Sequence, residues 1–162
     1  MYRIEKITKA HRVKAFDCGE ASLNGFLKSF ALKNDAHNIG RTYVAIEEGH
    51  AEVKGYYTLS AGSVTFDNFP AELKLPKYPI GTVHLGRLAT DLSARGRGLG
   101  EALLFDALQR AATAADEMGI KAVELFALNE NAKSFYLQYG FTELADDKFH
   151  LYLPIETILQ LI

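Results

Sequence analysis

The alternation of hydrophobic and polar residues predicts a set of short strands. Residues 2–7 alternate as one strand near the start of the chain. Residues 41–47 and 54–64 are rich in aromatic and β-branched residues, which favour strands, and the EEGHAE segment near their junction is typical of a turn. Three further strands are predicted over residues 82–89, 120–127 and 149–153.

Apolar residues at helical spacing predict helices between these strands. Residues 20–35 form one such segment, and residues 98–117 form a longer amphipathic one. A shorter helix is expected over residues 131–139, and Pro154 suits the first turn of a last helix that ends at Leu161. The expected apolar faces comprise Leu23, Phe26, Leu27, Phe30 and Ala31 in the first helix, and Leu99, Leu103, Ala107, Leu108 and Ala111 in the long one.

The order of these elements indicates the fold class. A strand and a helix are followed by three strands, and helices and strands then alternate, which predicts a mixed α/β sheet flanked by helices. Residues 65–80 hold all but one of the prolines and are expected to be irregular. No repeat or low-complexity run divides the chain, so residues 1–162 are interpreted as a single domain.

Composition and charge narrow the function classes. The formal net charge of −2 lacks the basic excess of a dedicated nucleic-acid binder, so any contact with RNA must depend on a local patch. The only cysteine, Cys18, excludes an intrachain disulfide and is interpreted as a small buried apolar residue. No signal peptide or membrane span is visible, so a cytoplasmic location is expected. The five histidines show no ligand spacing, so no metal site is predicted, and His84 is expected to pack or to line a pocket.

The strongest chemical signal lies between the strand that ends at Ala89 and the helix that begins near Gly98. The TDLSARGRGLG segment carries three glycines, which let the backbone turn tightly and approach a ligand without interference from a Cβ. The free N–H groups and the dipole of a helix N-terminus favour an anion, and Arg95 and Arg97 add charge suited to phosphate. The segment therefore predicts a phosphate or pyrophosphate site.

Other glycine-rich phosphate loops follow different patterns. A P-loop has Lys-Ser/Thr after its last glycine, but Glu101 and Ala102 follow here. A dinucleotide-binding turn has GxGxxG spacing after the first strand of its fold, whereas these glycines run GxGxG after a later strand. A tight turn that binds nothing is the remaining alternative, and the two arginines argue against it.

Arg95-x-x-Gly98-x-Gly100 resembles the pyrophosphate loop of the GNAT acetyltransferase superfamily, which also lies between a central strand and a long helix. The blocks LGRLATDLSARGRGLGEALLFDAL and AKSFYLQYGF resemble the toxin-like branch of that superfamily, which belongs to bacterial toxin–antitoxin systems. With FDCGEASLNGFL, GRTYVAIE and GYYTLSAGSV, the resemblance touches most of residues 11–142. It implies the GNAT fold, with a central strand that splays from its neighbour before the loop. It also implies an N-acetyltransferase that uses acetyl-CoA in direct transfer, without a covalent intermediate.

The resemblance implies roles for single residues. Main-chain donors near Leu88 and Ala89 would polarise the thioester carbonyl, where an acyl-transfer intermediate gathers negative charge. Asn129 would contact the pantetheine amide, and Tyr136 would protonate the departing CoA thiolate, for which a phenol with an ordinary pKa near 10 is a suitable donor. Without the resemblance, a tyrosine in an amphipathic helix is more often a packing residue. The complete expected cofactor-binding set is Leu88, Ala89, Thr90, Arg95, Gly96, Arg97, Gly98, Leu99, Gly100 and Asn129.

The acceptor that the resemblance implies is the α-amino group of an aminoacyl-tRNA, whose acetylation would block translation. No general base stands out in the sequence, and an α-amino group needs less help to lose its proton than a lysine side chain does. The resemblance also implies a ribbon-helix-helix antitoxin as partner and a homodimer. Basic residues that could form an RNA-binding patch are Lys9, His11, Arg12, Lys14, Lys28, Lys33, Arg41, Arg87 and Lys133.

Two alternative functions stay open on the sequence. One is a GNAT enzyme that acetylates a small amine or a protein N-terminus. The other is a CoA-binding module that has lost transfer activity and works through protein contacts. Expression toxicity relieved by an antitoxin would favour the toxin, activity on free polyamines would favour the first alternative, and CoA binding without transfer would favour the second.

Overall fold

The computed structural model describes residues 1–162 and contains one seven-stranded sheet in the order β1-β2-β3-β4-β5-β7-β6. The pairs β1–β2, β2–β3, β5–β7 and β6–β7 are antiparallel, while β4 and β5 run parallel with α3 as their crossover helix. The strands are β1 (Tyr2–Lys6), β2 (Arg41–Glu47), β3 (Val53–Val64), β4 (Ile80–Thr90), β5 (Ala122–Phe126), β6 (Thr142–Leu144) and β7 (Asp147–Pro154). The helices are α1 (Ala21–Ser29), α2 (Ala31–Ala36), α3 (Leu99–Glu117), α4 (Glu130–Leu137) and α5 (Ile155–Leu161), with short 3-10 turns at Phe66–Asn68, Ala71–Leu73 and Leu92–Ala94.

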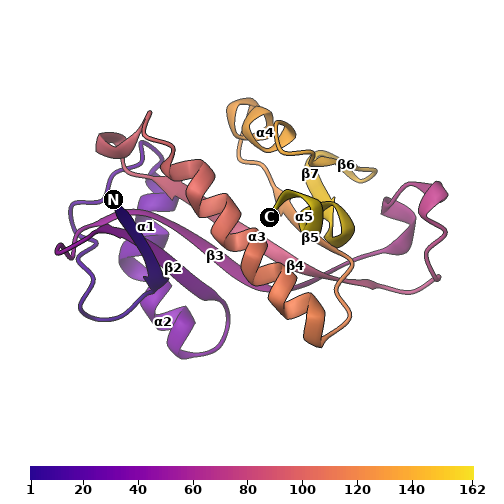
Figure 1. The fold of residues 1–162 in the computed structure, drawn as a ribbon, viewed down its shortest axis with the longest axis horizontal. Helices are drawn as coiled ribbons and strands as arrows, with labels where there is room; N and C mark the ends of the chain where they lie inside the picture. The colour runs from indigo at the N-terminus through magenta and orange to yellow at the C-terminus, as the bar shows by residue number, and fades with distance from the viewer. The chain divides into compact units, whose positions relative to one another are not determined.

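The chain forms two compact units, each with its own apolar cluster. Unit 1 comprises residues 1–60 and 86–107, and unit 2 comprises residues 61–85 and 108–162. In unit 1, α1 and α2 pack against β2 and β3 (Figure 1), because Phe26 and Ala31 share a cluster with Val44 and Tyr56.

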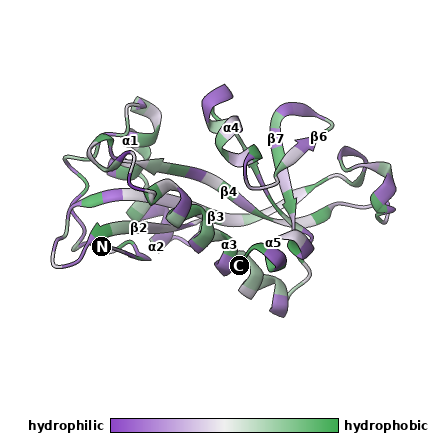
Figure 2. Cartoon of the chain, turned by 45° about the horizontal axis from the view of Figure 1, so that its top comes forward, coloured by the Kyte–Doolittle hydropathy of each residue, from purple (hydrophilic) through white to green (hydrophobic).

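The apolar cluster of unit 2 joins the irregular segment 65–80 to the strands of that unit. Val64, Ile80, Ala122 and Tyr152 belong to it, and the ring of Phe69 contacts the edge of Tyr152 with centroids 5.1 Å apart. Helix α5 lies beside β7 (Figure 1). Figure 2 shows hydrophilic residues of this unit on β6 and at one end of α4.

The predicted strands and the long helix are confirmed with small shifts of their ends. The segment 65–80 is irregular apart from two single 3-10 turns, as expected. The expected apolar face of α3 is buried throughout. No helix of the chain is long and apolar enough to span a membrane.

The prediction of one helix over residues 20–35 is wrong in one respect. The backbone of Phe30 leaves the helical region, with φ −126° and ψ −28°, and separates α1 from α2. The break turns Phe30 out of the expected apolar stripe, so that 55% of its surface is exposed while Phe26 and Leu27 stay buried. Strand β6 was not predicted, because its three residues are too few to show an alternation.

Candidate active site

The glycine-rich turn of unit 1 has an open backbone. Gly96 and Gly98 have φ values of +78° and +77°, which L side chains rarely adopt, and a Cβ built on either would meet nothing within 4 Å. The two glycines therefore serve the shape of the turn and leave its outer side accessible. A ligand can approach the main chain closely here.

Helix α3 begins at Leu99, directly after this turn. Its first hydrogen bond runs from the Ala102 N–H to the Gly98 carbonyl at 3.1 Å, which leaves the N–H groups of Leu99 and Gly100 outside the helix ladder. Free N–H groups at the positive end of a helix dipole favour a bound anion. The backbone of the turn is therefore suited to a phosphate group, and the phosphate site stays a prediction.

The two arginines of the turn differ in their surroundings. Arg95 donates from its guanidinium to the Cys18 carbonyl at 2.7 Å, and Cys18 is buried, as expected. Arg97 is exposed and forms no ion pair, so its charge is available to a ligand. Arg95 thus holds the turn against the segment before α1, and only part of its guanidinium remains for phosphate.

Asp91 fixes the start of the turn. Its carboxylate accepts hydrogen bonds from the Asp17 N–H at 2.9 Å and the Ser93 N–H at 3.0 Å. Burial alone would raise the pKa of Asp91, but hydrogen bonds from Ser93 and Asp17 outweigh it and hold the pKa below its ordinary value. The ionised carboxylate therefore ties the turn to the segment around Asp17.

Strand β4 carries Leu88, Ala89 and Thr90 into the turn. The parallel ladder joins Thr82–His84 to Ala122–Glu124 and does not continue, although β4 runs on to Thr90. The end of the pairing after His84 fits the splayed central strand that the resemblance implies.

Tyr136 lies in α4 of unit 2. Its ring is buried between Phe135 and Phe141, with centroids 5.2 and 5.5 Å away. Burial raises the pKa of Tyr136 above its ordinary value of 10.0. The Tyr136 hydroxyl makes no hydrogen bond within the chain. Every fully buried side-chain polar atom of the chain has a hydrogen-bond partner, so this hydroxyl reaches solvent. Tyr136 is therefore a neutral phenol that can donate a proton.

Asn129 has a structural role in addition to the one that the resemblance implies. Its side-chain oxygen accepts a hydrogen bond from the Ala132 N–H at 2.9 Å and caps the N-terminus of α4. The side chain is exposed, and its amide N–H₂ group has no partner within the chain. Asn129 can therefore cap the helix and still donate to a ligand.

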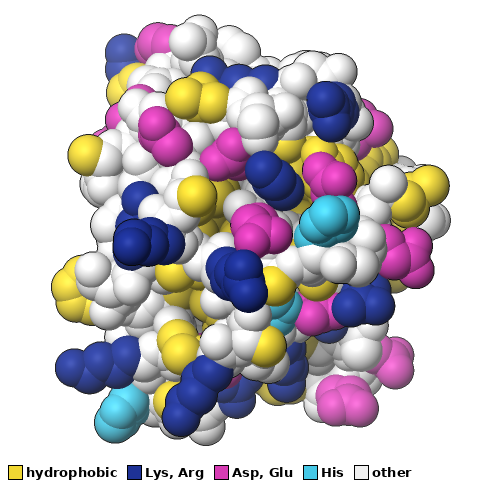
Figure 3. All heavy atoms as spheres, turned by 90° about the vertical axis from the view of Figure 1, so that its left-hand side faces the viewer, with side chains coloured by type: hydrophobic (Ala, Val, Ile, Leu, Met, Phe, Trp, Pro, Cys, Tyr) yellow, Lys and Arg dark blue, Asp and Glu magenta, His cyan; other side chains and the backbone are white.

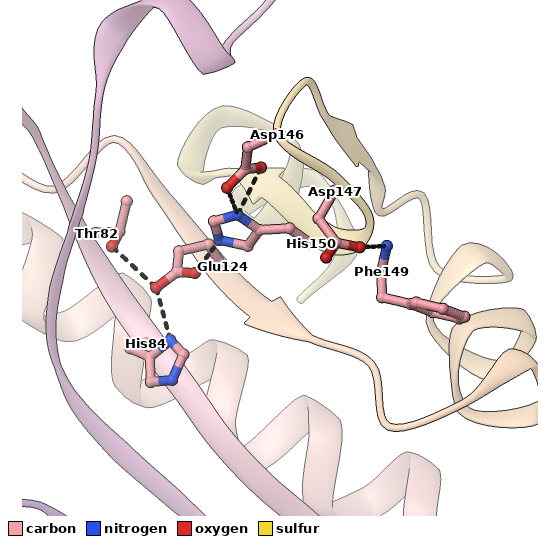
Figure 4. A network of polar contacts seen from close by, with 7 residues as sticks. All are labelled: Thr82, His84, Glu124, Asp146, Asp147, Phe149 and His150. Atoms are coloured by element: carbon pink, nitrogen blue, oxygen red, sulfur yellow. Dashed lines mark hydrogen bonds and ion pairs between the residues drawn. The ribbon is translucent and has the colours of Figure 1, made fainter.

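Unit 2 also contains a hydrogen-bonded chain of four titratable side chains that was not predicted from the sequence (Figure 4). Glu124 lies on β5, and its two oxygens are 2.6 Å from His84 Nδ1 and 2.6 Å from His150 Nε2. The other ring nitrogen of His150 is 2.9 Å from the carboxylate of Asp146. A lone glutamate within the apolar strand sequence AVELF was the available signal, but its partners lie 26 and 40 residues away.

The structure divides the predicted basic residues into paired and unpaired ones. Arg12, Arg41 and Lys133 form ion pairs with Glu52, Asp35 and Glu143, and His11 contacts Glu5. The basic residues that form no ion pair are Lys9, Lys14, Lys28, Lys33 and Arg87.

The fold and the glycine-rich turn define the class of enzyme. Residues 38–143 match the acetyltransferase (GNAT) domain family, and the chain belongs to this family. A tRNA-acetylating toxin of Mycobacterium tuberculosis is 36% identical over 159 residues, which cover 97% of this chain and 94% of that protein. The enzyme is thus a GNAT acetyltransferase with a toxin among its relatives.

Solved structures of toxins share the fold over almost the whole chain. A mutant of KacT in which phenylalanine replaces a tyrosine is 34% identical and has a TM-score of 0.94, with 99% of each chain covered. AtaT complexed with acetyl-methionyl-tRNAfMet is 32% identical, with a TM-score of 0.92 and 99% of each chain covered. AtaT and its antitoxin AtaR have been solved with acetyl-CoA, and KacT and its partner with DNA.

Proposed function

We propose that this acetyltransferase moves the acetyl group of acetyl-CoA to the α-amino group of an aminoacyl-tRNA and so blocks translation. The observation that carries the proposal is the full-length likeness to AtaT complexed with acetyl-methionyl-tRNAfMet. The relative from Mycobacterium tuberculosis, itself described as tRNA-acetylating, supports the same acceptor class. The proposal treats residues 1–162 as a single acetyltransferase domain.

The proposed cofactor site begins with the glycine-rich turn. Gly96 and Gly98 leave the main chain accessible, and the N–H groups of Leu99 and Gly100 would bind the pyrophosphate of acetyl-CoA together with the exposed Arg97. The N–H groups of residues 88–90 would face the pantetheine arm, and the amide N–H₂ of Asn129 would donate to it. No metal takes part in the proposed reaction.

In the proposed transfer, the neutral amine attacks the thioester carbonyl carbon. The new C–N bond forms as negative charge gathers on the carbonyl oxygen, where main-chain donors of β4 would stabilise it. The C–S bond then breaks, and the Tyr136 hydroxyl gives its proton to the CoA sulfur. The amine loses one proton to solvent and the Tyr136 phenolate takes one proton back from solvent, so that the products are an amide, free CoA and the regenerated phenol.

The proposal extends to the cellular setting of the enzyme. KacT and AtaT have been solved with antitoxin partners, which supports an antitoxin for this chain, and we propose the ribbon-helix-helix type. We further propose a homodimer and a cytoplasmic location, where charged tRNA is found.

The test is to incubate the enzyme with labelled acetyl-CoA and total charged tRNA. We expect label on the aminoacyl end of the RNA, and none on the same tRNA after its amino acids have been removed. Transfer to small amines without transfer to charged tRNA would overturn the proposed acceptor. CoA binding without transfer to any amine would overturn the enzymatic proposal.

A further inference from the structure

A cavity of about 540 Å³ lies between α1 and the end of β4 in unit 1. This volume is within the range of sites that bind small ligands. Its walls combine small residues, one leucine and a guanidinium with two aromatic rings. The lining includes Ser22, Gly25, Phe26, Ser29, Phe30 and Arg87.

Two stacking contacts connect three planar side-chain groups of this cavity. The guanidinium of Arg87 lies 3.6 Å from the centroid of the Phe26 ring. The ring of Phe26 stacks in turn with that of Phe30, with centroids 6.5 Å apart and an angle of 27° between the planes. Phe26 is buried, whereas Phe30 is half exposed because the chain breaks between α1 and α2 at this residue. The cavity therefore presents an aromatic face at its rim.

The charges around the cavity favour an anion. Arg87 is the only charged residue of the lining and forms no ion pair, while the exposed Lys28 and Lys33 lie on the two adjacent helices outside the lining. The acidic side chain of α2, Asp35, is already paired with Arg41 at 3.1 Å. Figure 3 shows Lys and Arg side chains distributed over one whole face of the molecule, with Asp and Glu side chains among them.

We propose that this cavity binds the unpaired nucleotide at the 3′ end of the acceptor RNA. The base would stack on Phe30, and Arg87 would contact the phosphate, since single-stranded nucleic acid is bound by aromatic platforms combined with cations. An aliphatic aminoacyl side chain in the same place would cover the Arg87 guanidinium without offering it an acceptor, which is unfavourable. The inference rests on the proposed function, because it names the part of the aminoacyl-tRNA that the cavity recognises.

The first test measures binding of an uncharged single-stranded oligoribonucleotide that ends in CCA, by fluorescence anisotropy. Phe30→Leu is expected to weaken binding at least about fivefold, while Phe30→Tyr, which keeps the stacking face, stays near wild type. Arg87→Gln is expected to lower the salt dependence of binding: the slope of the logarithm of the binding constant against the logarithm of the salt concentration should fall in magnitude by about 1. Tyr78→Leu changes a similarly exposed aromatic residue of unit 2 and is the matched control, with no expected effect.

The second test compares two acceptors, aminoacyl-tRNA and the amide of the same amino acid, which has no nucleotide. Phe30→Leu is expected to raise KM for the aminoacyl-tRNA and to leave KM for the amide unchanged. Equal effects on both acceptors would overturn the inference and assign the cavity to the aminoacyl group, and unchanged oligonucleotide binding would overturn it as well. The binding test requires no transfer, so it decides the role of the cavity even if charged tRNA fails as an acceptor.

Discussion

An oxygen of Glu124 lies 2.6 Å from Nε2 of His150, and both side chains are almost completely buried. Because an ionised carboxylate only accepts hydrogen bonds, the imidazole must donate. The second ring nitrogen of His150 lies 2.9 Å from the carboxylate of Asp146, so the ring bridges two carboxylates. The same glutamate also accepts from His84, and three elements of unit 2 are thereby tied together through one side chain.

Replacement of Glu124 by glutamine should destabilise the protein. The amide has no charge and only one accepting oxygen for the two histidines, so we expect a loss of about 2–3 kcal/mol in the free energy of unfolding, measured with urea. Glu156→Gln is the matched control, because the ion pair with Lys121 is exposed, and it should cost less than about 1 kcal/mol. Equal losses in the two variants would contradict this account of the buried chain.

The stability of the protein should also depend on pH through Glu124. Burial would raise the pKa of this carboxyl, but hydrogen bonds from His84 and His150 outweigh it and hold the pKa below the ordinary value of 4.5. A carboxyl whose pKa is lower in the folded state stabilises the fold above its unfolded pKa, and this contribution disappears as the pH falls through the folded pKa. The free energy of unfolding, measured between about pH 3 and pH 7, should therefore depend less on pH in Glu124→Gln than in the wild type. A parallel dependence in both proteins would argue against this role.

Tyr136→Phe tests the proposed proton donor. The ring and its contacts with Phe135 and Phe141 remain, and the lost hydroxyl makes no hydrogen bond within the chain, so the melting temperature should hardly change. Turnover should fall about 10²- to 10⁴-fold, the usual contribution of a general acid. Because burial raises the pKa of Tyr136, no loss of wild-type activity from its ionisation is expected below about pH 10. Tyr139→Phe in the same segment is the control, and near-normal turnover of Tyr136→Phe would exclude the assignment.

Gly98→Ala tests the glycine-rich turn. An L residue at φ +77° is strained by about 1–2 kcal/mol, and the added methyl group points into open space where the ligand would approach. We expect a matching loss of stability together with a higher KM for acetyl-CoA. Gly119→Ala is the control, since its Cβ would also meet nothing within 4 Å and its φ is not positive. If KM stays at the wild-type value, the pyrophosphate does not bind at this turn.

Two substitutions of Asn129 separate its role as a helix cap from its proposed role as a hydrogen-bond donor to acetyl-CoA. Asn129→Ala removes the cap of α4 and should cost about 1 kcal/mol of stability. Asn129→Asp keeps the accepting oxygen but loses the N–H₂ donor, so it should preserve stability and raise KM for acetyl-CoA. If KM for acetyl-CoA is unchanged in Asn129→Asp, the residue caps the helix and does not bind the cofactor.

The parts of the site that were predictable from the sequence are local. Gly96, Gly98 and the start of α3 lie within a few residues of one another, and the chemistry of such a turn follows from backbone geometry alone. The assignment of Tyr136 came from a resemblance, because a tyrosine in a helix carries no local sign of catalysis. Phe30 shows the limit of periodicity, since five apolar residues at helical spacing predicted one helix where the backbone makes two.

The sequence by itself determined the order of the elements, the glycine-rich turn and the family, because these depend on neighbours along the chain and on recognisable blocks. The tertiary structure decided which charges are neutralised and which remain. Arg41, Lys133 and Arg87 are alike in the sequence, but only the first two have a carboxylate within reach. The same holds for Glu124, whose two histidines come from distant strands. Electrostatic partners are set by distances in space, and sequence separation does not record them.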